Sequence, residues 1–258
     1  MKTEKNMVTN TFAADAIKRL KLRTAAAAVN VRKAHGGMIR VVAENLQDED
    51  YTCEVCSDTL AVIYDVRHVR HFVSLNHKEV RITLYLPEEL VFEHIDLQVG
   101  AGEAVMKDVP ISCQDMEVEI GAGEWRAAQL TVAGTLDVQV GAGRVRMKRA
   151  DVGSLQVECS VGNIVFKGAV QSDIRVECGM GSCRFELENK ESDFNYDISC
   201  AVGSVKVNGS GGTSFGSKKI YSNQNARGTA VLECGIGSIV LNTGSGAAKK
   251  VSLSKTHT

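Results

Sequence analysis

The sequence predicts an all-β fold: a single-domain parallel β-solenoid, resembling a β-helix, with coils of about 20 residues. The first observation is a short glycine motif that occurs seven times between residues 97 and 240. The second is its spacing, because consecutive copies lie 21, 20, 19, 19, 22 and 34 residues apart. The third is that apolar residues alternate with other residues on both sides of each motif, as in half-buried strands. The second glycines of the seven motifs are Gly102, Gly123, Gly143, Gly162, Gly181, Gly203 and Gly237.

Each motif predicts a strand, a glycine corner, a second strand and a return turn. Apolar residues stand seven, five and three positions before the second glycine and two and four positions after it. In the first copy they are Ile95, Leu97, Val99, Ala104 and Met106. The residue directly before the second glycine is apolar too. Alternation from the two sides places both that residue and the glycine inside, which predicts a shift of phase at the corner, as in a β-bulge.

The regular coils divide the chain into four parts. We expect a flexible N-terminus at residues 1–14, irregular N-terminal coils that cap the solenoid at 15–92, and regular coils at 93–242. Residues 208–229 are an insertion rich in Gly, Ser and Asn, which predicts a loop or a protruding hairpin. The tail at 243–258 is small and polar, and we expect it to cover the last open edge of the stack.

The outward positions of the coils carry charge of opposite sign on the two sides of the corner. Six and four positions before the second glycine, eight of fourteen residues are acidic and one is basic. Three and five positions after it, seven of fourteen are basic and one is acidic. We call these sides the acidic face and the basic face. The candidate interaction residues are Asp96, Glu117, Glu119, Asp137, Glu158 and Glu177 on the acidic face, and Lys107, Arg126, Arg146, Lys148, Lys167, Arg184 and Lys206 on the basic face.

Composition argues against several classes of protein. The net charge is −1, so the chain as a whole gives no reason to expect nucleic acid as a partner. No apolar run approaches the roughly 20 residues that span a bilayer, so we expect no membrane insertion. The first residues lack a secretion signal, so we expect a cytoplasmic protein, or a cell-surface protein if an upstream segment was removed. The eight cysteines are expected to be reduced and mostly buried.

No cofactor or metal site is predicted. The stretch Gly100–Gly102 lacks the third glycine and the following helix of a dinucleotide-binding loop. Cys53 and Cys56 form a C-x-x-C pair without a second pair at zinc spacing. His68, His71 and His77 lie close together in the sequence, but solvated histidines in a basic turn explain them.

Several motif copies carry a family resemblance. The units "VGAG", "CSVGNIVFKG", "CAVGSVKVNG" and "CGIGSIVLNTG", preceded by Leu86-Pro87, resemble a bacterial family of β-strand repeat proteins known as putative adhesins, a domain of unknown function. The resemblance covers residues 15 to 245 and implies a β-solenoid stack without catalytic residues.

These observations together predict a non-enzymatic scaffold or binding module of adhesin-like character that interacts through its charged flat faces. Its partner would be a protein, a polysaccharide or a second copy of the chain. The alternative is a β-helix enzyme acting on polysaccharide, because neighbouring coils could hold two carboxyl groups about 5 Å apart. A flat carboxylate ladder would favour binding, whereas carboxylates at the bottom of a walled cleft would favour catalysis.

Overall fold

The protein is an elongated stack of strands in a computed structural model that describes residues 7–46, 51–65, 79–214 and 217–244. The described residues are nearly all strand, and they contain two short 3₁₀ helices, η1 (Ala14–Ala16) and η3 (Glu191–Asp193), but no α-helix. All the strands belong to one sheet of 13 strands. None of the helices in this part of the chain is long and apolar enough to cross a membrane.

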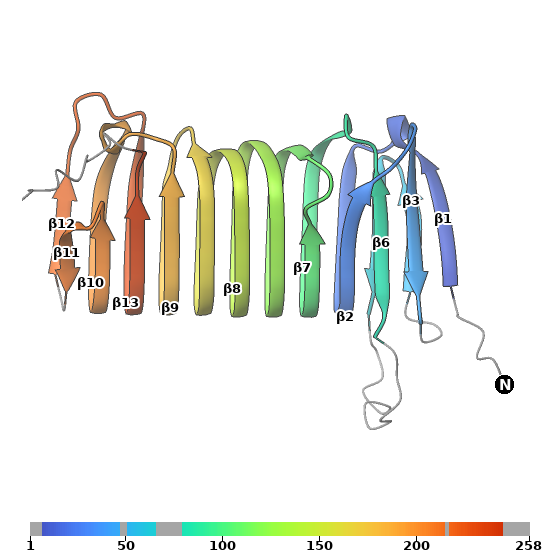
Figure 1. Ribbon diagram of the computed structural model, residues 1–258, viewed down its shortest axis with the longest axis horizontal. Coiled ribbons are helices and arrows are strands. Elements are labelled where there is room, and N and C mark those ends of the chain that lie inside the picture. Colours follow the sequence, from blue (N-terminus) through green and yellow to red (C-terminus); the bar gives the residue numbers. More distant parts are fainter. Residues whose placement is uncertain (1–6, 47–50, 66–78, 215–216, 245–258) are drawn as a thin grey trace, which may run out of the picture.

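The centre of the stack consists of long strands that bend at the glycine corner and pair in parallel (Figure 1). They pair at equivalent positions of the repeat: Val99 with Ile120, Cys159 with Cys178, and Gly181 with Gly237. Each column of the repeat is therefore a ladder that runs along the stack. These strands are β7 (Val91–Met106), β8 (Ile111–Val170), β9 (Ile174–Leu187), β10 (Phe194–Val207) and β13 (Gly228–Asn242).

The last coil in the sequence is not the last coil in the stack. Strand β13 pairs in parallel with β9 on one side and with β10 on the other, so it lies between two strands that precede it in the chain. Every coil presents the same apolar columns to its neighbours, so the core accepts β13 next to β9 as readily as β10. Two hydrogen bonds hold the segment that leads into β13. The Arg227 backbone N–H donates to the backbone carbonyl of Asp193, and the Arg227 guanidinium donates to the Asp193 carboxylate, both at 2.7 Å.

The insertion at 208–229 closes the C-terminal end of the stack. It contains β11 (Ser210–Ser214) and β12 (Ser217–Tyr221), which both pair antiparallel with the outer edge of β10. The expectation of a protruding hairpin is therefore wrong, because these strands use the backbone groups that β10 leaves unpaired. The described strands that cover this edge come from the insertion and not from the tail, of which residues 245–258 lie outside the described residues.

The N-terminal end is closed by strands of mixed direction. Strand β2 (Arg19–Lys33) pairs in parallel with β7, and its other edge pairs with β5 (Thr59–Tyr64) and β6 (Arg81–Leu86). Beyond them, β3 (Met38–Glu44) and β4 (Tyr51–Cys56) pair antiparallel with β6 and β5. Residues Met7–Ala13 form β1 on the edge of β3, so this part of the expected flexible N-terminus is an ordered strand. Its Val, Thr and Phe residues favour extended backbone.

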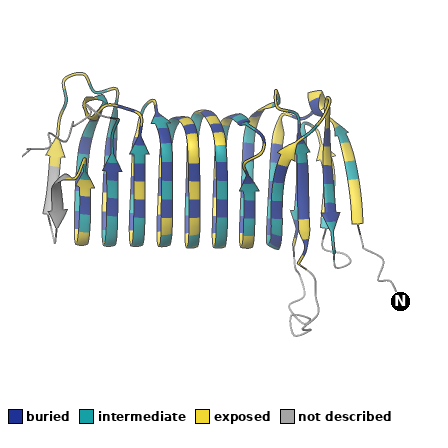
Figure 2. Ribbon diagram, viewed as in Figure 1, coloured by how far each residue is buried: buried dark blue, intermediate teal, exposed yellow. Residues whose placement is uncertain are grey.

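The inward columns form one continuous apolar core, as the sequence predicts (Figure 2). All residues five positions before the second glycine are at most 1% exposed, and so is the single tryptophan, Trp125, in the column two positions after it. Of the five predicted columns, Val207 alone is only partly buried. Along each strand the charged columns alternate with the buried apolar columns, so the charged side chains point to the outer surface.

The corner differs from the prediction in one respect. The residue directly before the second glycine points outward, and the expectation of an inward side chain there is wrong. The interior is already filled by the columns three positions before and two positions after the glycine. Cys159 of the first column, for example, contacts Cys183 of the second. The apex residue then has no room inside. We call the exposed apolar row at the apex the corner ridge: Ala101, Ala122, Ala142, Val161, Met180, Ile236 and Val202, in their order along the stack.

Candidate functional site

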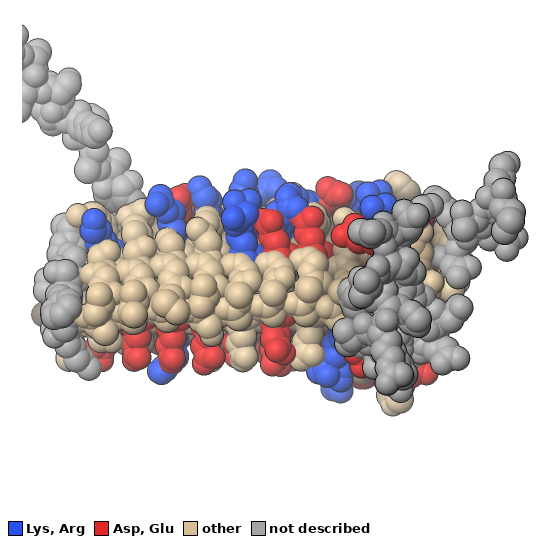
Figure 3. Space-filling model, turned by 90° about the horizontal axis from the view of Figure 1, so that it is seen from below, with Lys and Arg blue, Asp and Glu red and all other residues tan. Residues whose placement is uncertain are grey.

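The thirteen candidate interaction residues all lie outside the core, and none is buried. The acidic and basic faces stand on opposite sides of the corner ridge, and the view from below shows an uncharged band between them (Figure 3). The structure therefore brings the acidic residues together in rows along the stack, and the basic residues in separate rows. It does not bring the two sets into one cluster.

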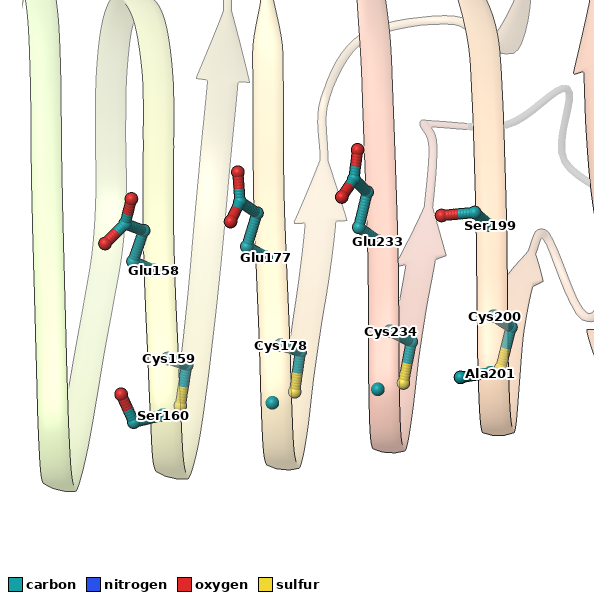
Figure 4. A pocket seen from close by; sticks show the side chains of 12 residues that line it. Glu158, Cys159, Ser160, Glu177, Cys178, Ser199, Cys200, Ala201, Glu233 and Cys234 are labelled. Atoms are coloured by element: carbon teal, nitrogen blue, oxygen red, sulfur yellow. The ribbon is translucent and has the colours of Figure 1, made fainter. Parts of the chain in front are cut away.

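The acidic face contains an open groove across four neighbouring coils, with a volume of about 660 Å³. Glu158, Glu177 and Glu233 stand side by side along it, because Glu177 is the register partner of both other glutamates (Figure 4). We call this feature the glutamate groove. Glu233 is not among the candidate residues. It occupies the same column as Glu158 and Glu177, four positions before the second glycine, so the repeat pattern could have identified it.

A row of buried thiols lies behind the glutamate groove, on the inner side of the strands that line it (Figure 4). Cys159, Cys178, Cys234 and Cys200 are in register on neighbouring strands, free, and 2–4% exposed. Burial, together with the neighbouring thiols Cys178 and Cys200, raises the pKa of the Cys234 thiol to about 12. Cys234 is therefore protonated at neutral pH, so it adds no charge to the groove.

The carboxylates of the acidic face influence one another. Burial raises the pKa of Asp137, and the neighbouring carboxylates Glu117 and Glu158 add to this effect. Arg175 is the cation placed among the groove glutamates, and its guanidinium donates hydrogen bonds to Glu177 at 2.6 and 2.9 Å. Since three glutamates share one arginine, the groove retains negative charge.

The basic face is partly neutralised by residues that the alternating pattern did not point to. Glu103 and Glu124 stand one position after the second glycine, next to the corner ridge. Glu103 pairs with Arg126, and Glu124 lies within 3.7 Å of Arg126 and 3.4 Å of Arg146. In contrast, four cations of the basic face form no ion pair with any residue that the structure describes: Lys107, Lys148, Arg184 and Lys206. The acidic face is neutralised in part as well, because Arg23 pairs with Asp96 at 2.8 Å and Arg175 pairs with Glu177 at 2.6 Å.

The described ranges contain no group of three or more His, Cys, Asp and Glu side chains arranged to hold a metal ion. Cys53 and Cys56 lie in the antiparallel strand β4 as free thiols. The predicted histidine turn with His68, His71 and His77 lies outside the described residues.

The chain matches no curated protein, and it is similar to solved structures at low sequence identity. A crystal structure of a putative cell adhesion protein from Clostridium sporogenes is 15% identical, with a TM-score of 0.45, and the match covers 93% of this chain and 100% of that one. A crystal structure of a putative adhesin from Bacteroides fragilis is 14% identical, with a TM-score of 0.42, and covers 92% and 97% of the two chains.

The family comparison agrees with the resemblance inferred from the glycine motifs. Residues 17–223 match the family model described as Toastrack DUF4097. This range begins at the irregular N-terminal coils and includes six of the seven glycine corners. The chain therefore belongs to the Toastrack DUF4097 family.

Proposed function

We propose that the chain is a non-enzymatic β-solenoid with coils of about 20 residues that acts as a rigid, adhesin-like binding module. Its partner is a protein or polymer with a basic surface, and the acidic face holds it. The single observation that carries this proposal is the glutamate groove, in which three carboxylates stand in register on neighbouring strands.

The arrangement of the groove suits binding of an extended cationic chain. The parallel ladder spaces the carboxylates by about 4.8 Å, so side chains along a partner can meet them at regular intervals. The groove is open to solvent along its length, and Glu158 and Glu233 are exposed. The backbone ladder below holds the row in place, so a partner need not order the site on binding.

A labelled oligolysine peptide provides a direct test by fluorescence anisotropy. We expect binding that weakens steeply with added salt, because exposed charges are screened within about 10 Å at 0.1 M ionic strength. The triple variant Glu158→Gln, Glu177→Gln, Glu233→Gln should weaken binding at least tenfold. The matched control changes three exposed glutamates outside the acidic face, Glu54→Gln, Glu89→Gln and Glu188→Gln, and alters the net charge equally. Equal loss in the two triple variants would reject the groove as the binding surface.

A polysaccharide-acting enzyme remains the alternative, because the glutamates lie at a spacing close to the roughly 5 Å between the carboxyl groups of retaining glycosidases. Against it, the groove is open, and Arg175 already binds one of its carboxylates, that of Glu177. Incubation with a panel of neutral and acidic polysaccharides should release no new reducing ends. Release by the native chain that the triple glutamine variant lacks would replace the binding proposal by the enzymatic one.

A further inference from the structure

We propose that the corner ridge is a self-association surface on which a second copy of the chain docks side by side. The observation behind this is the C-terminal half of the ridge, where four large apolar side chains stand exposed in a row. Their exposed fractions are 47% for Val161, 51% for Met180, 60% for Ile236 and 47% for Val202. They belong to neighbouring strands in register, so they form one strip and are not scattered. Contiguous exposed apolar strips on soluble proteins mark contact surfaces.

The charges beside the ridge select a second copy as the occupant. The acidic face flanks one side of the ridge and the basic face the other (Figure 3). A two-fold axis parallel to the stack lays ridge on ridge and brings the acidic flank of each copy against the basic flank of the other. A two-fold axis perpendicular to the stack and lying in the plane of the interface would oppose two acidic flanks. The parallel arrangement is therefore the self-complementary one.

The parallel two-fold axis also determines which residues meet. It preserves position along the stack, so each coil faces the same coil of the other copy. Glu177 stands three residues before Met180, and Arg184 stands four residues after it, so the two flank the ridge in one coil. Arg184 thus faces Glu177 of the partner subunit, the central member of the glutamate groove. Arg184 has no ion pair within the described part of its own chain, so its charge is available.

The size of the surface predicts a weak dimer. Seven ridge residues at about 4.8 Å per strand extend over about 30 Å. With a width of about 15 Å, each copy would bury about 450 Å², which is below the roughly 800 Å² per partner of a standard interface. The dimer should therefore form at high micromolar concentration and dissociate on dilution. Met180 suits such a contact, because its unbranched side chain adapts to an irregular partner surface.

Sedimentation velocity over a concentration series, with small-angle X-ray scattering at the highest concentration, tests the arrangement. We expect the sedimentation coefficient to rise toward that of a dimer. The maximum dimension should stay close to that of the monomer, because the copies lie side by side. Met180→Asp should weaken the dimer at least tenfold. Val91→Asp, at a position that is 65% exposed and outside the ridge, is the matched control and should leave it unchanged.

Charge reversal provides the specific test of the two-fold axis. Arg184→Glu and Glu177→Arg should each weaken the dimer several-fold, and the two changes together should restore it, because the ion pair reforms with opposite polarity. Retained Trp125 fluorescence shows that each variant folds. A monomer at all concentrations, a doubled maximum dimension or a double variant weaker than both single variants would overturn the proposal. Arg184→Glu and Met180→Asp leave all groove carboxylates in place, so oligolysine binding by these variants separates this proposal from the proposed function.

Discussion

At Gly181 one added carbon atom would collide with the backbone of the neighbouring coil. A Cβ built there would lie 2.2 Å from the carbonyl oxygen of Gly162, and the backbone φ is +154°. Both facts exclude a side chain, the first by contact and the second by conformation. The second glycine of the motif is thus required by the stacking of identical corners.

Gly181→Ala should destabilise the protein by about 2 kcal/mol or more, because the collision involves backbone on both sides and cannot be relieved by a rotamer change. Urea unfolding followed by the fluorescence of Trp125 measures the change. Gly37→Ala is the control, since a Cβ there meets no atom within 4 Å. A Gly181 variant as stable as the Gly37 variant would contradict the stacking argument.

At Asp137, burial and the neighbouring carboxylates of the acidic face together oppose ionisation. Its folded pKa is raised, so the folded protein holds this proton more tightly than the unfolded chain does. The unfavourable contribution is therefore present above the folded pKa and disappears as the pH falls below the unfolded pKa of about 4.

Asp137→Asn should consequently stabilise the protein at neutral pH by a few tenths of a kcal/mol, and the gain should vanish under acid conditions. Urea midpoints at several pH values measure this difference. High salt should also reduce the gain, because it screens the neighbouring carboxylates. Asp108→Asn, an exposed aspartate outside the acidic face, is the control. A gain independent of pH would show that ionisation of Asp137 is not its cause.

The placement of strand β13 depends on the turn that connects the insertion to it. Arg227 binds Asp193 through both its backbone and its side chain, directly before β13 begins beside β10. Burial opposes ionisation of Asp193, but a hydrogen bond from the Arg227 guanidinium, another from the Lys190 backbone N–H and the positive charge of Arg227 outweigh it and lower the pKa of that carboxyl. The pair thus aligns the first residues of the inserted strand.

A double-mutant cycle of Arg227→Ala and Asp193→Ala should give a coupling free energy of about 0.5–1 kcal/mol, because the arginine is half exposed and the aspartate is mostly covered. Hydrogen exchange should accelerate in the amides of the first residues of β13. The exposed pair Lys33 and Glu88 serves as the comparison and should couple less strongly. Equal coupling of the two pairs would mean that the return turn is not a special anchor.

The repeat predicts the all-β fold and the pairing of its strands at equivalent positions. The columns identify the core, and alternation places the charged residues outside it. The order of the last coils could not be predicted in this way, because β10 and β13 carry the same columns and either would fit beside β9. The capping by β11 and β12 was missed because Gly- and Ser-rich sequence is typical of loops.

The candidate site could be predicted in part. The carboxylate rows follow from the outward columns. The groove also depends on the small lining residues Ser160, Gly179 and Gly235, which leave space between the glutamates and the corner. The corner ridge was misplaced because apolar character favours burial, although the apex has no interior volume left. Glu103 and Glu124 were missed because they lie at the corner, where alternation changes phase.

The place of β13 between β9 and β10 has a consequence for synthesis on the ribosome. When the chain has been made only as far as β12, the coil that separates β9 from β10 does not yet exist. Strand β10 can therefore take its native place in the stack only once β13 has been made. The C-terminal coils cannot join the stack in the order of the sequence, and its completion waits for residue 242.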